Sequence, residues 1–374
     1  MQLDKRCHGP RVGSRWSPGS GDLRIDPTAW SHARRVEYYR GGPFARCALP
    51  VGEPKAEDFA GDEQLVWIWR LQLQPHPWAG VLNMSSRHAT ESYTPLTARV
   101  RGIGLLGPGF DDWGGAAQVL AGAIPYVSRA TVLPTPAALP AAERRRTGGV
   151  VKLALAIGFE AVSRSGMKAS ELPTVFSSSG GDGNNCHEIC QALASTDRQI
   201  SPTRFHNSVH NAASGYWSIA AAATPASNVL CAFDATFGAG LLEALTQVVV
   251  DQRPVLLVAY DTGYPEPLHS VRPIQDAFGV AMVLEPVGSP RSPSQAAATN
   301  STVPLESPLA IITAALVDAP VEPMADAQLE ALRTAIPAAR GLPLLTKLAR
   351  REPGRVVIEY LDTQRIAVEV SECR

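Results

Sequence analysis

Short runs of consecutive apolar residues alternate with helical segments through the middle of this chain, and that alternation limits the folds open to it. The predicted strands are residues 100–107, 174–179, 229–233, 254–260 and 280–285. Strands buried on both faces read as continuous apolar runs, whereas half-exposed strands alternate with polar residues. The pattern therefore predicts an α/β fold in which a mostly parallel sheet is covered by helices on both faces.

Helical periodicity fills the intervals between these strands. Helices are predicted at residues 116–123, 147–165, 186–193, 207–223 and 235–249, with more between 326 and 350. A strand at 309–316 and a hairpin that pairs 355–361 with 366–370 complete the expected elements. Small residues mixed with apolar ones in the helix at 147–165 indicate close packing.

The first part of the chain has a different composition. It holds five of the seven tryptophans, is broken by Gly-Pro pairs and has one strand-like run, at 64–73. We expect residues 1–96 to form an irregular or disordered extension. An alternative is an over-extended gene start, with residues 1–83 untranslated and Met84 as the true start. Residues 97–374 would form one layered domain, interrupted by a low-complexity loop at 288–303.

Charge and composition exclude several classes of protein. The chain has 34 Lys and Arg against 35 Asp and Glu, so it lacks the basic surplus of a nucleic-acid-binding protein. No apolar run reaches the roughly 18–20 residues that span a bilayer, and the N-terminus lacks the apolar segment of a secretory signal. Six cysteines in 374 residues are too few for a disulfide scaffold. The expected location is the cytoplasm.

Two groups of residues have spacings that occur in metal sites. Cys186, His187 and Cys190 lie within about one helical turn, and His206 and His210 are four residues apart, which places both on one face of a helix. The cysteine spacing lacks the turn of a zinc knuckle, and no Glu lies between the two histidines to act as a base. Ordinary packing is therefore the favoured interpretation, and no metal or other cofactor is expected.

Two glycine-containing junctions between a strand and a helix are further candidates. Residues 180–183 have the context of an anion-binding turn but match neither common phosphate-loop pattern, so a plain turn is favoured. At residues 229–242 a strand runs into a helix rich in Gly and Ala. Such a junction can hold a nucleophilic thiol at a helix N-terminus, where the dipole lowers its pKa. Alternatively, the small residues serve only the close packing of a buried helix.

The order of these segments resembles that of the β-ketoacyl synthases of the thiolase superfamily. The match rests on four stretches, residues 99–109, 173–181, 200–220 and 229–244, and covers about 99–285. The His-Asn-Ser-Val-His-Asn-Ala sequence at 206–212 is similar to that of a shorter, chain-length-factor-like group. The resemblance implies a thiolase-like layered α/β/α fold with an abbreviated second half, preceded by the irregular extension.

The chain departs from this family at the position of the nucleophilic cysteine. Counting back along the helix places Asp234 there, and an Asp cannot form the acyl thioester of a condensing cysteine. Cys231 lies three residues earlier. After His210 the only histidine is His269, so a Cys-His-His site cannot be assembled from the second half. We expect Asp234 to have a structural or capping role at the start of the helix. The alternatives are acid–base chemistry by Asp234 and a reactive Cys231 with His206 or His210 as its base.

The resemblance implies a non-catalytic, chain-length-factor-type partner of an active β-ketoacyl synthase in type II polyketide, aryl-polyene or fatty-acid-like biosynthesis. The implied partners are that ketosynthase, in a heterodimer, and an acyl carrier protein; a homodimer is also possible. Residues expected to line the acyl tunnel and dimer interface are Phe205, His206, Asn207, His210, Asn211, Tyr216, Trp217 and Phe237. The alternatives are an active acyltransferase or 3-oxoacyl synthase that uses Cys231, and a stand-alone acyl-binding module.

Overall fold

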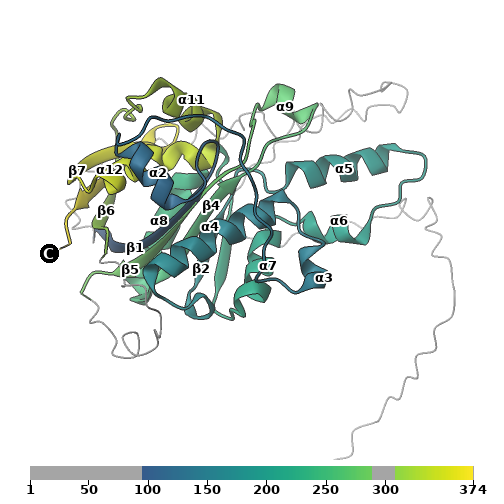
Figure 1. Ribbon diagram of the computed structural model, residues 1–374, viewed down its shortest axis with the longest axis horizontal. Helices are drawn as coiled ribbons and strands as arrows, with labels where there is room; N and C mark the ends of the chain where they lie inside the picture. Colours follow the sequence, from purple (N-terminus) through teal and green to yellow (C-terminus); the bar gives the residue numbers. More distant parts are fainter. Residues whose placement is uncertain (1–94, 289–307, 374) are drawn as a thin grey trace, which may run out of the picture. The chain divides into compact units, whose positions relative to one another are not determined.

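The computed structural model describes residues 95–288 and 308–373, whose strands form one eight-stranded sheet in the order β3-β2-β4-β5-β1-β6-β8-β7 (Figure 1). The strands are β1 Leu96–Leu106, β2 Thr174–Ser177, β3 Ser227–Leu230, β4 Val255–Asp261, β5 Phe278–Pro286, β6 Ala310–Val317, β7 Gly354–Leu361 and β8 Gln364–Ser371. The predictions for residues 1–94, and for the part of the low-complexity loop at 289–303, lie outside the described residues.

The prediction of a mostly parallel sheet is wrong. β2 is parallel to β3 and to β4, whereas every other pair of neighbouring strands in the described sheet is antiparallel. Continuous apolar runs report burial on both faces of a sheet and carry no information on strand direction. β5 lies antiparallel between β4 and β1, and the C-terminal strands extend the same sheet through β6 and the predicted hairpin. The sheet is therefore mixed.

Helices cover both faces of the sheet and make a three-layered α/β/α domain, as the sequence predicts. The described α-helices are α2 Trp113–Leu120, α3 Ala141–Arg144, α4 Gly149–Ser165, α5 Gly183–Ala194, α6 Pro202–Asn207, α7 Ala212–Ala221, α8 Thr236–Asp251, α9 Leu268–Val271, α11 Ala327–Ala335 and α12 Leu342–Arg350. Short 3-10 turns are η4 Ala169–Glu171, η5 Phe233–Ala235 and η6 Pro337–Gly341.

The central strand β4 shows how the two layers of helices share the sheet. Val255, Leu257 and Ala259 face the apolar core on the side of α8 and α12. Leu256, Val258 and Tyr260 face a second apolar core on the side of α4 and α7. All seven residues of the strand are buried, because neighbouring side chains point to opposite and equally covered faces.

Two glycines of β1 allow α4 to lie directly against the strand. A Cβ at Gly104 would lie 2.0 Å from the backbone oxygen of Ile157 in α4, and one at Gly102 would lie 2.2 Å from that of Ala161. The side chain of Glu160, between these two, accepts hydrogen bonds from the backbone N–H groups of Leu105 and Trp113. The close packing predicted for α4 is therefore confirmed.

The helix predicted at 207–223 is two helices. α6 ends at Asn207 and α7 begins at Ala212, with i→i−3 backbone bonds from Ser208 to Phe205 and from Ala212 to Val209 between them. The buried Asn207 side chain donates to the backbone oxygen of Arg146, which ties the end of α6 to the turn before α4. Such a tertiary bond cannot be read from periodicity.

The strand predicted at 229–233 is shifted and more exposed than expected. β3 pairs only with β2, so it is an edge strand, and its residues are exposed or half-exposed. The helix that follows, α8, is confirmed as closely packed: a Cβ at Gly240 would lie 2.8 Å from Cβ of Ser177 in β2. Among the described residues, the segment Phe233–Asp251 alone has the length and hydropathy of a membrane span, and half of that window is buried inside the domain, as in a core helix.

Replacing Gly104 by Ala is expected to destabilise the domain by about 1–3 kcal/mol, because the added methyl group would displace the backbone of α4. Gly215 provides the control: it lies on the exposed side of α7, and a Cβ added there would meet no atom within 4 Å. Gly215→Ala is expected to leave stability unchanged or raise it by about 0.5–1 kcal/mol. Urea unfolding measures both, and equal effects of the two substitutions would contradict this packing.

Candidate functional site

The carboxyl ends of β2, β3 and β4 meet at one edge of the sheet, because these three strands are parallel. Ligands of open α/β sheets bind outside the carboxyl ends of the strands. Ser177, Leu230 and Asp261 are the last residues of the three strands. The loops that follow them carry Ser178 and Ser179 and the thiol of Cys231.

Asp261 is the buried centre of this edge. Its carboxylate accepts hydrogen bonds from the backbone N–H of Ser179 at 2.8 Å, from the hydroxyl of Ser179 at 2.7 Å and from the backbone N–H of Ala338 in η6 at 2.8 Å. Burial raises the pKa of Asp261 to about 6, although these donors oppose the rise. One carboxylate thus ties the ends of β2 and β4 to the C-terminal part of the chain.

Cys231 and His210 lie together beside this centre. The Cys231 thiol is in hydrogen-bond contact with the His210 ring and donates to the backbone oxygen of Ser179 at 3.1 Å. His210 Nε2 lies 3.1 Å from the backbone oxygen of Ser178, an acceptor, so Nε2 carries a proton. The other ring nitrogen is then left as the basic one in neutral His210.

This contact changes the ionisation of both groups. The hydrogen bond with His210 lowers the pKa of the Cys231 thiol, and burial opposes the effect only in part. The same hydrogen bond raises the pKa of His210. Cys231 is exposed, so the arrangement offers an accessible thiol with an enhanced thiolate fraction.

Asp234 does not cap α8, so the capping part of the predicted structural or capping role is wrong. The N-cap of α8 is Ala235, without a side-chain hydrogen bond, and Asp234 lies one residue earlier in η5. Its two carboxylate oxygens are bound instead by Arg272, at 2.8 Å, and by Arg340, at 3.1 Å. For the Asp234 carboxylate, two charge-assisted hydrogen bonds to guanidinium groups are stronger than an interaction with the helix dipole. The sequence gives no reason to expect Arg272 or Arg340 next to Asp234.

The ion pairs continue away from Asp234. Arg340 also lies 3.8 Å from Glu359 in β7, and Glu359 is bound by Arg333, which pairs with Glu330 in α11. The hydrogen bonds that Arg333 donates to Glu330 raise the pKa of Arg333. The loop that holds Asp234 is therefore joined by charged side chains to β7 and α11.

Arg272 fixes this loop in a second way. Its guanidinium carbon lies 3.7 Å from the ring centroid of Phe233, a cation–π contact. Phe233 has a positive φ of 52°, a conformation that a bulky residue rarely adopts. Arg272 thus holds both Phe233 and Asp234, the residues that turn the chain from β3 into α8.

The residues predicted to line a tunnel and interface divide into two groups. Phe205, His206 and Asn211 are exposed, and His210 is half-buried beside Cys231. Asn207, Tyr216, Trp217 and Phe237 are buried within the domain's own core. Of the two candidate bases, His210 is the one that contacts the Cys231 thiol. The ring of His206 packs against that of Tyr216, with 5.9 Å between the ring centroids.

The remaining polar candidates are placed as follows. His269 contacts the backbone oxygen of Ile274 in its own loop, at 3.3 Å. Cys186 and Cys190 lie on α5 and contact each other, and burial raises the pKa of Cys186 to about 11. No group of three or more His, Cys, Asp or Glu side chains in the described part of the chain is arranged to hold a metal ion.

Sequence reasoning missed Asp261, Arg272 and Arg340. Asp261 could have been recognised from the sequence, because it is an acidic residue directly after an uninterrupted apolar strand. The two arginines had none: they lie 38 and 106 residues after Asp234 and are joined to it only by the fold.

Comparison with known proteins fits this architecture. The sequence profile described as "Beta-ketoacyl synthase, N-terminal domain" matches residues 121–317, more than half of the chain. The chain is thus a thiolase-like protein of the ketosynthase type. It belongs to the β-ketoacyl synthase family. Among curated proteins, none matches the sequence significantly.

Solved structures agree on the fold. A chain from the ketosynthase ApeO in complex with its chain length factor ApeC, from Xenorhabdus doucetiae, is 22% identical with a TM-score of 0.54; the match covers 73% of this chain and 99% of that one. The ishigamide ketosynthase/chain length factor is 13% identical with a TM-score of 0.53, covering 74% of this chain and 100% of that one. In both comparisons the match covers nearly the whole of the other chain.

The thiol of Cys231 is expected to react with iodoacetamide at a lower pH than an unperturbed cysteine, because His210 stabilises its thiolate. His210→Gln should shift the pH dependence of the labelling rate at Cys231 to higher pH. His206→Gln is the control, since that ring packs on Tyr216 and not on the thiol. Peptide mapping after timed labelling measures the rate at Cys231, and identical profiles for His210→Gln and the wild type would contradict the contact.

The buried Asp261 is expected to make the folded state less stable as the pH rises from about 4 to 6. In that range the folded protein still binds the proton on Asp261, whereas the unfolded chain has released it. Asp261→Asn is expected to remove this pH dependence, which amounts to about 2 kcal/mol of unfolding free energy between pH 4 and 6. Urea unfolding between pH 4 and 7 tests this, with the exposed Asp251→Asn as the control; an unchanged slope in Asp261→Asn would contradict it.

Proposed function

We propose that this chain is a non-condensing, chain-length-factor-type subunit that pairs with an active β-ketoacyl synthase. The observation that carries the proposal is the state of Asp234 at the family's nucleophile position. A carboxylate there cannot form the acyl thioester, and both of its oxygens are engaged by Arg272 and Arg340. The residue that would carry condensation is thus a structural anchor, and the partner would supply the reactive cysteine.

The shape of the domain supports a partner on one side. α5 and α6 lie together and project from the body, at the right of Figure 1. Leu193 at the end of α5, Phe205 on α6 and Val209 after it are 49%, 67% and 51% exposed. Exposed apolar side chains on neighbouring helices are typical of an interaction surface. β3, at one edge of the sheet, offers unpaired backbone groups to a partner as well.

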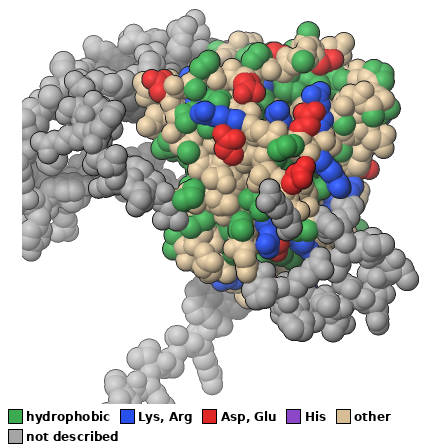
Figure 2. All heavy atoms as spheres, turned by 90° about the vertical axis from the view of Figure 1, so that its left-hand side faces the viewer, with side chains coloured by type: hydrophobic (Ala, Val, Ile, Leu, Met, Phe, Trp, Pro, Cys, Tyr) green, Lys and Arg blue, Asp and Glu red, His purple; other side chains and the backbone are tan. Residues whose placement is uncertain are grey.

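The opposite end of the domain differs in character. Around β7, β6 and α12, acidic and basic side chains are mixed among the hydrophobic ones (Figure 2). Arg355 and Glu369 pair there at 3.8 Å across β7 and β8. Such a face is suited to solvent. The partner would therefore dock on the side of α5, α6 and β3, where Phe205, His206, His210 and Asn211 lie.

The pathway and substrates follow from the same proposal. A subunit of this kind would shape the acyl tunnel of the pair, in type II polyketide, aryl-polyene or fatty-acid-like biosynthesis in the cytoplasm. Its substrates would arrive on an acyl carrier protein. The solved complexes that resemble this chain include a ketosynthase with its chain length factor and a ketosynthase bound to an acyl carrier protein, which supports these partners.

A second candidate function rests on the contact between Cys231 and His210. An accessible thiol with a lowered pKa in contact with the His210 ring could accept an acyl group from a thioester. The proton would pass from the thiol to His210 and then to the departing thiolate. The chain would then be an acyltransferase in its own right, without the partner's cysteine.

Condensation by the purified pair separates the two functions. Cys231→Ser is expected to leave the rate of chain extension within about twofold, because the proposal places the chemistry on the partner. Replacing the reactive cysteine of the partner by Ala should abolish extension. Cys373→Ser, just after β8 and far along the sheet from β3, serves as the matched control. Loss of extension in Cys231→Ser, with the pair still assembled by size-exclusion chromatography, would contradict the first function and favour the second.

A further inference from the structure

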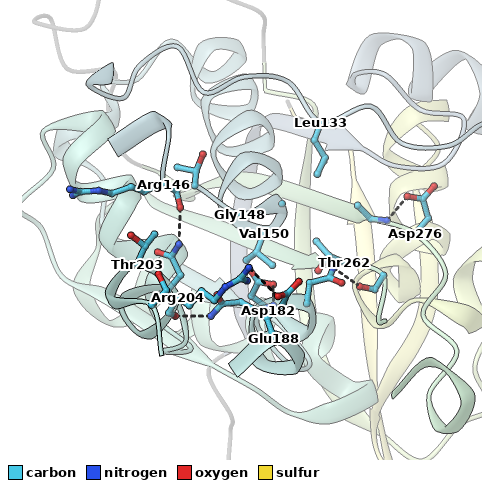
Figure 3. A pocket seen from close by; sticks show the side chains of 18 of the residues that line it. Leu133, Arg146, Gly148, Val150, Asp182, Glu188, Thr203, Arg204, Thr262 and Asp276 are labelled. Atoms are coloured by element: carbon cyan, nitrogen blue, oxygen red, sulfur yellow. Dashed lines mark hydrogen bonds and ion pairs between the residues drawn. The ribbon is translucent and has the colours of Figure 1, made fainter. Parts of the chain in front are cut away.

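Cys231 lies at the start of a tight turn, outside the cavity at the same edge of the sheet. That cavity, of about 530 Å³, is lined by the first turns of α4 and α5, by α6 and by the loops after β4 (Figure 3). Neither Cys231 nor the two residues that follow it belong to this lining. The surroundings of the thiol are therefore set by the turn between β3 and α8.

Thr236 closes this turn. Its hydroxyl donates to the backbone oxygen of Phe233 at 2.6 Å and accepts from the backbone N–H of Ala232 at 3.2 Å. Thr236 is fully buried, so both hydrogen bonds are shielded from water. The peptide group between Ala232 and Phe233 is thus held on both of its sides. A change in either torsion beside this peptide group would turn the whole group.

The N–H of that peptide group is directed at the Cys231 sulfur. The hydrogen bond with His210 lowers the pKa of Cys231 most, burial opposes it, and a hydrogen bond from the backbone N–H of Phe233 lowers the pKa further. A thiolate at Cys231 therefore has two donors, of which the backbone N–H does not titrate.

This direction of the N–H depends on an unusual backbone conformation. The ψ of Ala232 is 37° and the φ of Phe233 is 52°. Of the other four described non-glycine residues with a positive φ, three end helices, where the conformation is common: Ala222, Gln252 and Arg351. Phe233 ends no helix, and its bulky side chain raises the free energy of a positive φ. A contact from elsewhere in the fold is needed to hold it.

Arg272 supplies that contact. Its guanidinium carbon lies 3.7 Å from the centroid of the Phe233 ring, a side chain that is otherwise 48% exposed. Its Nη2 donates to Asp234 at 2.8 Å, so one guanidinium holds two consecutive side chains of the turn. Relaxation of Phe233 to a negative φ would break one or both of these contacts.

Arg272 is itself fixed in place. Its side chain is 11% exposed, and the hydroxyl of Tyr264 is in hydrogen-bond contact with it. The backbone N–H of Arg272 donates to Leu268 at 3.0 Å, and its backbone oxygen accepts from Ile274 at 2.8 Å. The guanidinium is therefore a fixed part of the loop after β4 and not a mobile surface charge.

We propose that Arg272 is a positioning residue for the thiolate of Cys231. It holds Phe233 at a positive φ and thereby keeps the N–H of Phe233 on the sulfur, beside His210. The described groups in hydrogen-bond contact with the thiol belong to His210, Phe233 and Ser179, so Arg272 acts through Phe233. The proposal rests on the reactive thiol of the second candidate function, and not on pairing with a ketosynthase.

The pH dependence of iodoacetamide labelling at Cys231 tests this role in the full-length protein, by peptide mapping after timed reaction. Phe233→Leu removes the ring that Arg272 covers, and Arg272→Met removes both contacts of the guanidinium. Each is expected to shift the labelling profile to higher pH by about 0.5–1 pH unit, so that the rate at pH 7 falls about three- to tenfold.

Arg340→Met is the matched control. Arg340 binds the same carboxylate of Asp234, at 3.1 Å, whereas the cation over the Phe233 ring belongs to Arg272. The control therefore removes an equal charge from the same carboxylate and leaves the ring contact, so it is expected to keep the wild-type profile. Arg272→Lys keeps a cation for both partners and is expected to reverse most of the shift.

A wild-type profile in Phe233→Leu and Arg272→Met would overturn the proposal. An equal shift in Arg340→Met would also overturn it, because the effect would then come from charge alone. Circular dichroism checks the folding of each variant, and Phe233→Leu, at a half-exposed position, decides if Arg272→Met does not fold. If His210→Gln shifts the profile and Phe233→Leu does not, the reactive thiol stands and only the role of Arg272 fails.

Discussion

The buried carboxylate of Asp261 is the interaction on which the functional edge of this domain depends. Removing an ion from water costs several kcal/mol unless donors compensate it, and here the donors come from Ser179 after β2 and from Ala338 in η6. The sheet edge and the C-terminal segment must therefore come together for Asp261 to be satisfied. The carbonyl of the same Ser179 accepts from Cys231, and Thr262 follows Asp261 in the chain.

The loop between β3 and α8 is held by contacts from distant segments of the chain. Asp234 in this loop is bound by two guanidinium groups, those of Arg272 and Arg340. Arg272 also covers Phe233, whose strained backbone makes the turn. Nearby, the contact with His210 lowers the pKa of the Cys231 thiol.

The layered fold could be predicted from the sequence because burial on both faces leaves a continuous apolar signal, as in β4. Strand direction could not, since β5 is as apolar as β4 and yet runs antiparallel to it. The edge position of β3 and the break between α6 and α7 depend on tertiary contacts, such as that of Asn207 with Arg146. Asp234 could be found as a candidate from its place at the strand–helix junction, whereas Arg272 and Arg340, which bind it, could not.

The central claim is that this chain supports condensation without carrying an acyl group itself. Intact-protein mass spectrometry tests it most directly, after the pair of this chain and a ketosynthase is incubated with an acylated carrier protein. The account predicts that the mass of the acyl adduct appears on the ketosynthase alone. A stoichiometric adduct on this chain that disappears in Cys231→Ser would contradict it.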